Sequence, residues 1–127
     1  MKRNFALIML TALLLPFAAE ARIRPADLRC EYMRSSLCVD SPQPRLSWII
    51  DGGRKRDVMQ KSYRILVASE KSLLREGKAD LWDSGIVESQ DMSQVIYEGK
   101  PLGSFQQCYW KVKVWDCKGK AGRWSKT

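Results

Sequence analysis

The segment Tyr109–Asp116, YWKVKVWD, constrains the fold of this chain more than any other part of the sequence. Its apolar residues Trp110, Val112 and Val114 alternate with lysines, so one face is apolar and the other is basic. Alternation with period two, in β-branched and aromatic residues, is typical of a half-buried antiparallel strand. The turn-rich residues 116–122 follow directly. The segment therefore predicts the penultimate strand of a β-sandwich and the turn into its last strand.

Other short segments share this extended, turn-bounded character: 28–32, 45–50, 60–69, 81–87 and 94–97. Trp48, in the second of them, is the best candidate for the central aromatic side chain of the core. Residues 70–77 differ, because hydroxyl caps, two adjacent leucines and a final glycine predict one or two helical turns between strands. Strands at this spacing predict an all-β sandwich of about seven antiparallel strands, the seventh starting at Trp124.

The first 21 residues have the layout of a secretory signal peptide. Lys2 and Arg3 precede the apolar run 5–15, and residues 19–21 (AEA) place small residues where a signal peptidase reads. The run is shorter than the roughly 18 residues that a membrane-spanning helix needs. We therefore expect cleavage before Arg22, no membrane contact of the mature chain, and a periplasmic, cell-surface or secreted location.

The mature chain, residues 22–127, is long enough for one domain with one core. It holds 20 basic and 13 acidic residues, a formal net charge of +7. A basic balance can indicate an anionic partner. Here the basic residues are spread along the chain, and their only run is 54–56, between turn residues. We therefore expect no nucleic-acid partner.

The four cysteines, at positions 30, 38, 108 and 117, do not define a metal or redox site. Export permits disulfides, and four cysteines allow three complete pairings, of which Cys30–Cys38 and Cys108–Cys117 are the local options. The spacings fit neither a zinc ribbon nor a redox pair, and the chain has no histidine. We expect free or partly paired structural cysteines, and neither metal nor cofactor.

The sequence offers little for catalysis. Without histidine there is no Ser-His or Cys-His nucleophile arrangement, and no phosphate-binding or dinucleotide-binding glycine motif is present. A glycosidase needs two carboxyl groups facing one sugar. The best pair, Asp80 and Asp83, flanks the dipeptide Leu81-Trp82 and is interpreted as a feature of a turn and a strand edge. The chain itself is not expected to be catalytic.

Five segments together resemble a known family, in this order: Cys30–Tyr32, Pro44–Trp48, Ser62–Ser69, Ala79–Gly85 and Tyr109–Asp116. Their order and spacing resemble the N-terminal immunoglobulin-like (fibronectin type III-like) domain of bacterial α-L-rhamnosidases of glycoside hydrolase family 78. The resemblance implies a large, often exported parent enzyme that removes terminal α-L-rhamnose from plant glycans by inversion. It also implies that a helical (α/α)6 barrel, absent from this chain, performs the reaction.

The resemblance makes this chain an accessory module that packs on or orients the catalytic barrel. Trp115 shares a face with Lys111 and Lys113, and Trp82 has no clear side. These four residues are the candidate surface, for contact with the remainder of the enzyme or for stacking on plant polysaccharide; domain contact is the favoured interpretation. The alternative function is a stand-alone carbohydrate-binding or adhesion-type module.

The end of the chain leads to one more expectation. Only two residues follow Ser125, yet a sandwich of this plan needs a full last strand beside residues 107–116. We therefore expect a domain truncated in its last strand. The missing strand would leave a row of unpaired backbone groups on the edge of the 107–116 strand.

Overall fold

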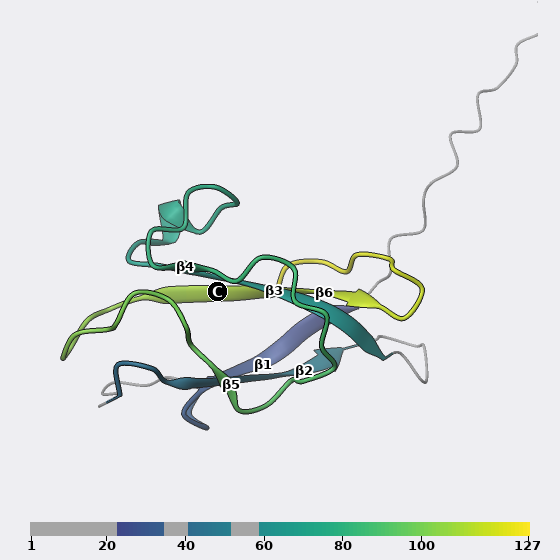
Figure 1. Ribbon diagram of the computed structural model, residues 1–127, viewed down its shortest axis with the longest axis horizontal. Helices are drawn as coiled ribbons and strands as arrows, with labels where there is room; N and C mark the ends of the chain where they lie inside the picture. The colour runs from purple at the N-terminus through teal and green to yellow at the C-terminus, as the bar shows by residue number, and fades with distance from the viewer. Residues whose placement is uncertain (1–22, 35–40, 52–58) are drawn as a thin grey trace, which may run out of the picture.

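The computed structural model describes residues 23–34, 41–51 and 59–127. The strands in these ranges are β1 (Arg24–Cys30), β2 (Arg45–Asp51), β3 (Gln60–Ala68), β4 (Trp82–Asp83), β5 (Val95–Ile96) and β6 (Tyr109–Asp116). They form two antiparallel sheets, ordered β1-β2-β5 and β4-β3-β6, which lie face to face (Figure 1). The predicted all-β sandwich is confirmed. No helix in the described part of the chain is long and apolar enough to cross a membrane.

The core lies between the two sheets and is built from the alternating residues that the sequence indicates. β3 and β6 pair over their whole lengths and bury four aliphatic side chains: Ile65, Val67, Val112 and Val114. Trp48 of β2 is buried against them and meets Tyr63 edge to face, with ring centroids 5.3 Å apart. Each such side chain contributes about 1.5–3 kcal/mol when it leaves water. The prediction of Trp48 as a core aromatic is confirmed.

Gln60 is buried, and its side-chain amide is hydrogen-bonded both to β2 and to the loop before β5. Its Oε1 accepts from the indole Nε1 of Trp48 at 3.0 Å. Its Nε2 donates to the carbonyl oxygens of Ser89 and Asp91 at 2.9 and 3.0 Å. The amide therefore joins β2, β3 and residues 89–91, and no buried side-chain nitrogen or oxygen in the described residues is left without a partner.

Both boundaries of β1 differ from the prediction of a strand over 28–32. β1 begins at Arg24, before the predicted start at residue 28, and it includes Pro25. A proline is tolerated there because β1 is an edge strand of its sheet, where one side needs no amide donor. β1 also ends before Tyr32, the last residue of the predicted strand 28–32, which has a positive φ of 66° and is 55% exposed.

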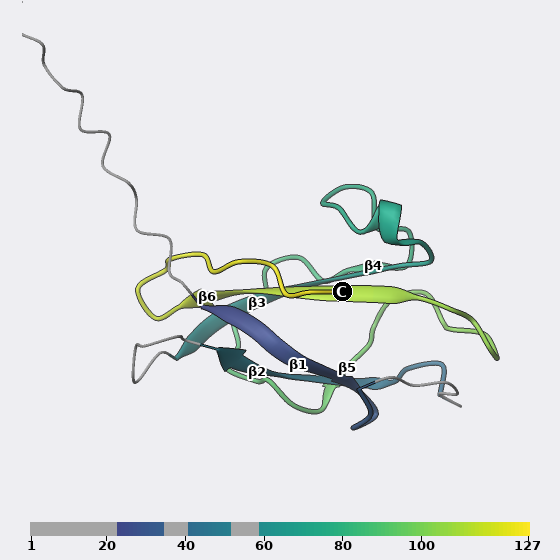
Figure 2. The ribbon, with the colours of Figure 1, turned by 180° about the vertical axis from the view of Figure 1, so that it is seen from behind.

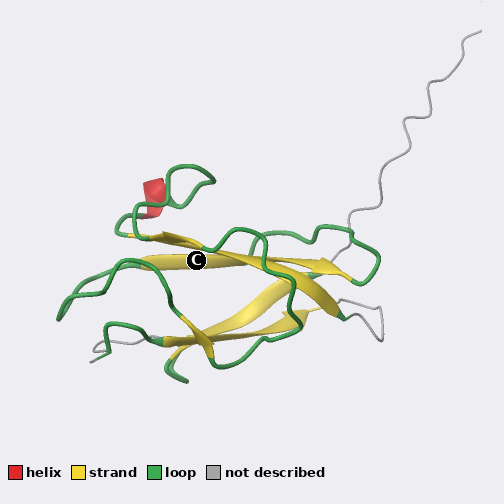
Figure 3. Cartoon of the chain, in the orientation of Figure 1, coloured by secondary structure: helices red, strands yellow, loops and turns green. Residues whose placement is uncertain are grey.

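The middle of the chain is less regular than predicted. The 81–87 segment contributes only the two residues of β4, and Gly85 has a φ of 64° that ends the extended conformation. The expected helical insertion is the single 3-10 turn η1 (Lys71–Leu73), the only red element among the yellow strands (Figure 3).

The C-terminal residues cover part of the β6 edge that was expected to be bare. The amides of Gly122 and Ser125 donate to the carbonyls of Val114 and Val112, both at 2.8 Å. The amide of Val112 donates to Oγ of Ser125 at 3.0 Å. The prediction of an open edge is therefore wrong along Val112 and Val114, although residues 121–125 are not a strand.

The cysteines can be placed in part. Cys108 is half-buried and Cys117 is exposed, and within the described residues these two are not joined to each other. Burial raises the pKa of the Cys108 thiol. Cys38 and the predicted signal peptide, residues 1–21, lie outside the described residues.

Candidate functional site

The candidate surface lies on the outer face of the sheet β4-β3-β6, on the side away from the core. Odd-numbered residues of β6 point outward here, each opposite an even-numbered residue of β3: Tyr109–Ala68, Lys111–Leu66, Lys113–Arg64 and Trp115–Ser62. Leu66 and Ala68 are buried in a second apolar cluster, with Leu74 from the segment after β3 and the half-buried ring of Trp124. The domain therefore covers much of this face with its own chain.

The structure brings together three of the four predicted site residues. The ammonium nitrogen of Lys113 lies 5.4 Å from the ring centre of Trp115 and 5.8 Å from that of Trp124. Nζ of Lys111 lies 4.7 Å from the ring centre of Trp124, and burial lowers the pKa of this lysine. Such contacts contribute about 0.5–1 kcal/mol each at exposed sites. Both lysines are thus engaged with aromatic rings of their own domain.

Trp82 is not part of this group. It lies in β4 and packs against the core between the sheets. Its ring meets Tyr97 edge to face, with centroids 5.3 Å apart. Because the indole is partly buried against the core, Trp82 contributes to packing in this structure.

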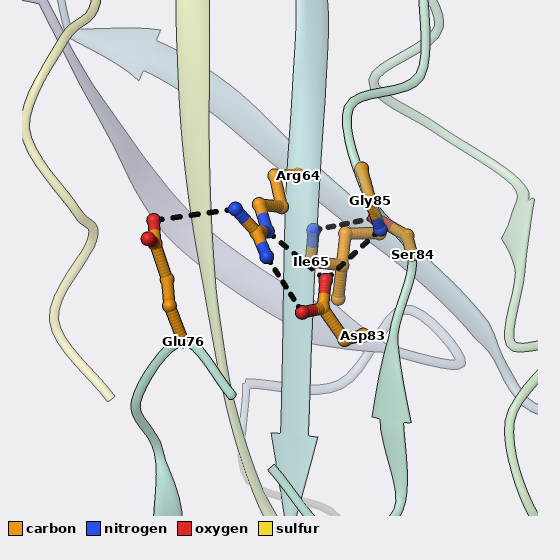
Figure 4. A network of polar contacts seen from close by, with 6 residues as sticks. All are labelled: Arg64, Ile65, Glu76, Asp83, Ser84 and Gly85. Carbon is orange, nitrogen blue, oxygen red and sulfur yellow. Dashed lines mark hydrogen bonds and ion pairs between the residues drawn. The ribbon is translucent and has the colours of Figure 1, made fainter. Parts of the chain in front are cut away.

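An ion-pair network on the outer face joins β3, β4 and the segment after η1 that holds Glu76. The guanidinium of Arg64, on β3, binds Asp83 of β4 through two nitrogens, at 3.0 and 2.7 Å. Its third nitrogen lies 3.4 Å from the carboxylate of Glu76. The backbone amide of Gly85 donates to the same Asp83 carboxylate at 2.9 Å (Figure 4). The hydrogen bonds from Arg64 are the main cause that holds the pKa of Asp83 below its ordinary value of 3.8, and the hydrogen bond from the Gly85 amide adds to this effect.

Acidification is expected to weaken this network. Because the folded-state pKa of Asp83 is lowered, its stabilising contribution is present above about pH 4 and is lost as the pH falls through the folded-state pKa. Thermal unfolding of the wild type and of Arg64→Gln, followed from about pH 6 to about pH 2, measures this effect. The wild type should lose more of its Tm than the variant over this range. Parallel curves would contradict the assignment.

The two carboxylates considered for glycosidase chemistry, Asp80 and Asp83, both accept hydrogen bonds from other residues of the domain. Asp80 accepts from the backbone amide and from the hydroxyl of Ser69. These bonds hold the pKa of Asp80 below its ordinary value, as Arg64 does for Asp83. A general acid for glycoside cleavage needs a raised pKa. Both carboxylates are thus engaged within the domain, and neither has the raised pKa of a general acid.

One exposed feature was missed from the sequence. Phe105 is 88% exposed, the most of any large apolar side chain in the described residues. It lies within ten consecutive uncharged residues, Pro101–Trp110, the longest such run after position 22. Residues 103–107 of that run are exposed, whereas Leu102, Cys108 and Trp110 pack against the core.

Residues 25–127 match the family model for the Rha78A-like, N-terminal immunoglobulin domain. The chain belongs to this family. The chain is 44% identical over 91 residues to an α-L-rhamnosidase of Formosa agariphila, covering 70% of this chain and 9% of the relative. It is 40% identical over 106 residues to an α-L-rhamnosidase of Streptomyces avermitilis, covering 81% of this chain and 10% of the relative.

Solved structures show the same similarity. The Streptomyces avermitilis α-L-rhamnosidase complexed with L-rhamnose superimposes with a TM-score of 0.75 at 37% identity, over 81% of this chain and 10% of that one. The α-L-rhamnosidase from Dictyoglumus thermophilum gives a TM-score of 0.77 at 31% identity, over 84% and 12%. The chain thus corresponds to the N-terminal immunoglobulin-like domain of these enzymes and spans about a tenth of their length.

Proposed function

We propose that this chain is a non-catalytic accessory module of an exported α-L-rhamnosidase, and that it packs on or orients the catalytic part of that enzyme. The observation that carries the proposal is the share of each protein that matches: the matched region covers 81% of this chain but only 10% of the Streptomyces avermitilis relative. A domain fixed at the front of a much larger enzyme meets its neighbours in the same polypeptide at a high effective concentration.

The chemistry of the described residues supports a role without catalysis. Asp80 and Asp83 are held ionised by hydrogen-bonding partners, so neither is suited to give a proton to a leaving group. No group of three or more potential metal ligands occurs within the described ranges. The conspicuous outward side chains, Lys111, Lys113 and Trp115, contact aromatic or cationic partners on the domain itself.

A chimera tests the proposal. In the Streptomyces avermitilis α-L-rhamnosidase, the segment that matches this chain is replaced by residues 22–127, and an enzyme lacking the segment serves as the reference. The chimera should keep its activity on an aryl α-L-rhamnoside longer at elevated temperature than the reference does. The 127-residue chain alone should show no turnover.

Two results would count against this function. Turnover by the chain alone would make it an enzyme, and a chimera no more durable than the reference would remove the accessory role. Binding of the chain alone to a rhamnose-rich polysaccharide, lost on Trp115→Ala, would instead favour a carbohydrate-binding module. Export is tested separately, by fusing residues 1–21 to a reporter that is active only outside the cytoplasm.

A further inference from the structure

The loop between β5 and β6 extends beyond the ends of both sheets, at the left in Figure 1 and at the right in the reversed view of Figure 2. Phe105 lies in this loop, with 88% of its surface exposed. The next most exposed large apolar residue in the described chain is Ile86, at 60%. Single exposed apolar side chains are common on proteins and carry no argument alone. Phe105 has three further properties that do.

The backbone of Phe105 is held in a conformation that suits other residues better. Its φ is 57°, in the left-handed region, which costs a bulky side chain energy that glycine or asparagine avoids. The surrounding turn is closed twice: the amide of Gln106 donates to the carbonyl of Gly103 at 3.2 Å, and the amide of Gly103 donates to Oε1 of Gln106 at 2.8 Å. The turn thus presents a phenylalanine where folding alone favours glycine or asparagine.

The loop is also anchored at its base. The hydroxyl of Tyr97 donates to the carbonyl of Lys100 at 2.6 Å. The amide of Leu102 donates to the carbonyl of Pro42 at 3.3 Å, which ties the loop to the segment before β2. On the other side, Nε2 of Gln107 donates to the hydroxyl of Tyr109 at the start of β6. An aromatic side chain on an anchored turn loses little conformational entropy when it binds.

The composition of the loop matches the centre of a protein interface. Charged residues are depleted at interface centres and aromatic residues are enriched there. Between Lys100 and the start of β6 at Tyr109 the loop has no charged side chain, and residues 103–107 of this part are exposed. Loops at the ends of a sandwich are, in addition, the usual carriers of binding residues in immunoglobulin-like folds.

We propose that the tip of this loop, the exposed and uncharged residues 103–107 with Phe105 as its anchor, is the surface by which the module contacts the remainder of its α-L-rhamnosidase. The inference rests on the accessory function proposed above. The partner is the rest of the same polypeptide because the relatives continue for about nine times the length of this module. A sugar fits less well, since phenylalanine offers no hydrogen bond and the neighbouring Gln106 oxygen is already used by Gly103.

The substitution Phe105→Asn separates a binding role from a structural one. Asparagine tolerates a positive φ, so the chain alone should unfold at the same or a slightly higher urea concentration than the wild type. In the chimera, the same substitution removes the anchor and should shorten the half-life of rhamnosidase activity at a fixed temperature by at least about fivefold. Ile86→Asn, at another exposed apolar position outside the uncharged run, should change neither measurement.

The outcomes distinguish this inference from the function on which it rests. If the wild-type chimera is no more durable than the enzyme without the segment, the accessory function fails and the tip proposal fails with it. If the wild-type chimera is durable and Phe105→Asn matches it, only the tip proposal is overturned. If Phe105→Asn destabilises the chain alone as much as it destabilises the chimera, Phe105 has a structural role. If Phe105→Asn abolishes binding of the chain to a rhamnose-rich polysaccharide, the tip is a sugar-binding surface. Either result also overturns the proposal.

Discussion

Replacing Gly99 by alanine is expected to destabilise the domain by about 3 kcal/mol, at the upper end of the cost of overpacking. An added Cβ would lie 2.6 Å from the carbonyl oxygen of Leu81, 2.6 Å from the hydroxyl oxygen of Tyr97, and closer still to Cβ of Trp82. These neighbours have little room to move. The Leu81 carbonyl accepts from the amide of Lys100 at 3.0 Å, and the Tyr97 ring is buried against Trp82.

Gly103 provides a matched control in the same loop. A Cβ there would have only Oε1 of Gln106 near it, at 3.7 Å, an ordinary contact with a flexible side chain. Gly103→Ala should therefore leave the stability of the domain within about 0.5 kcal/mol of the wild type. Urea denaturation of both variants gives the comparison. Similar midpoints for the two would show that the close packing at Gly99 relaxes without cost.

The alternating pattern of β6 predicts its partner face and its buried residues because a strand with one apolar face has a single way to meet the core. The same holds for Trp48 in β2. Trp82 could not be placed in this way, since β4 is too short for an alternating pattern to give it a side. Its burial depends on Tyr97 and on the close approach of Gly99, contacts between residues far apart in the sequence.

The sequence predicts which residues of β6 lie on the outer face, but not which side chains they contact there. Parity places Lys111, Lys113 and Trp115 on one side of β6, and the register agrees. That Trp124 lies beside both lysines depends on the path of the chain after residue 116, where turn residues leave many directions open. The same path lets Ser125 cover the edge of β6, which no local pattern indicates.

Gln60→Leu is expected to cost about 3 kcal/mol, although leucine is apolar and similar in size. The substitution would leave the Trp48 indole N–H without its partner in a buried setting, and the carbonyls of Ser89 and Asp91 without theirs in a partly buried one. A buried polar group that loses its partner costs about 1–3 kcal/mol, and partial exposure of the loop carbonyls limits the total. Chemical denaturation followed by tryptophan fluorescence measures the loss. Gln43→Leu, at an exposed position before β2, is the control and should stay within about 0.5 kcal/mol.

A double-mutant cycle with Trp48→Phe decides whether the hydrogen bond to the indole is responsible. Phenylalanine has no N–H to satisfy, so in that background Gln60→Leu should cost about 1 kcal/mol less than in the wild type. The remaining cost would report on the carbonyls of Ser89 and Asp91, which Gln60 holds through Nε2. An unchanged cost in the two backgrounds would assign the whole effect to this loop. In that case Gln60 would act by fixing the loop before β5 rather than by orienting the central tryptophan.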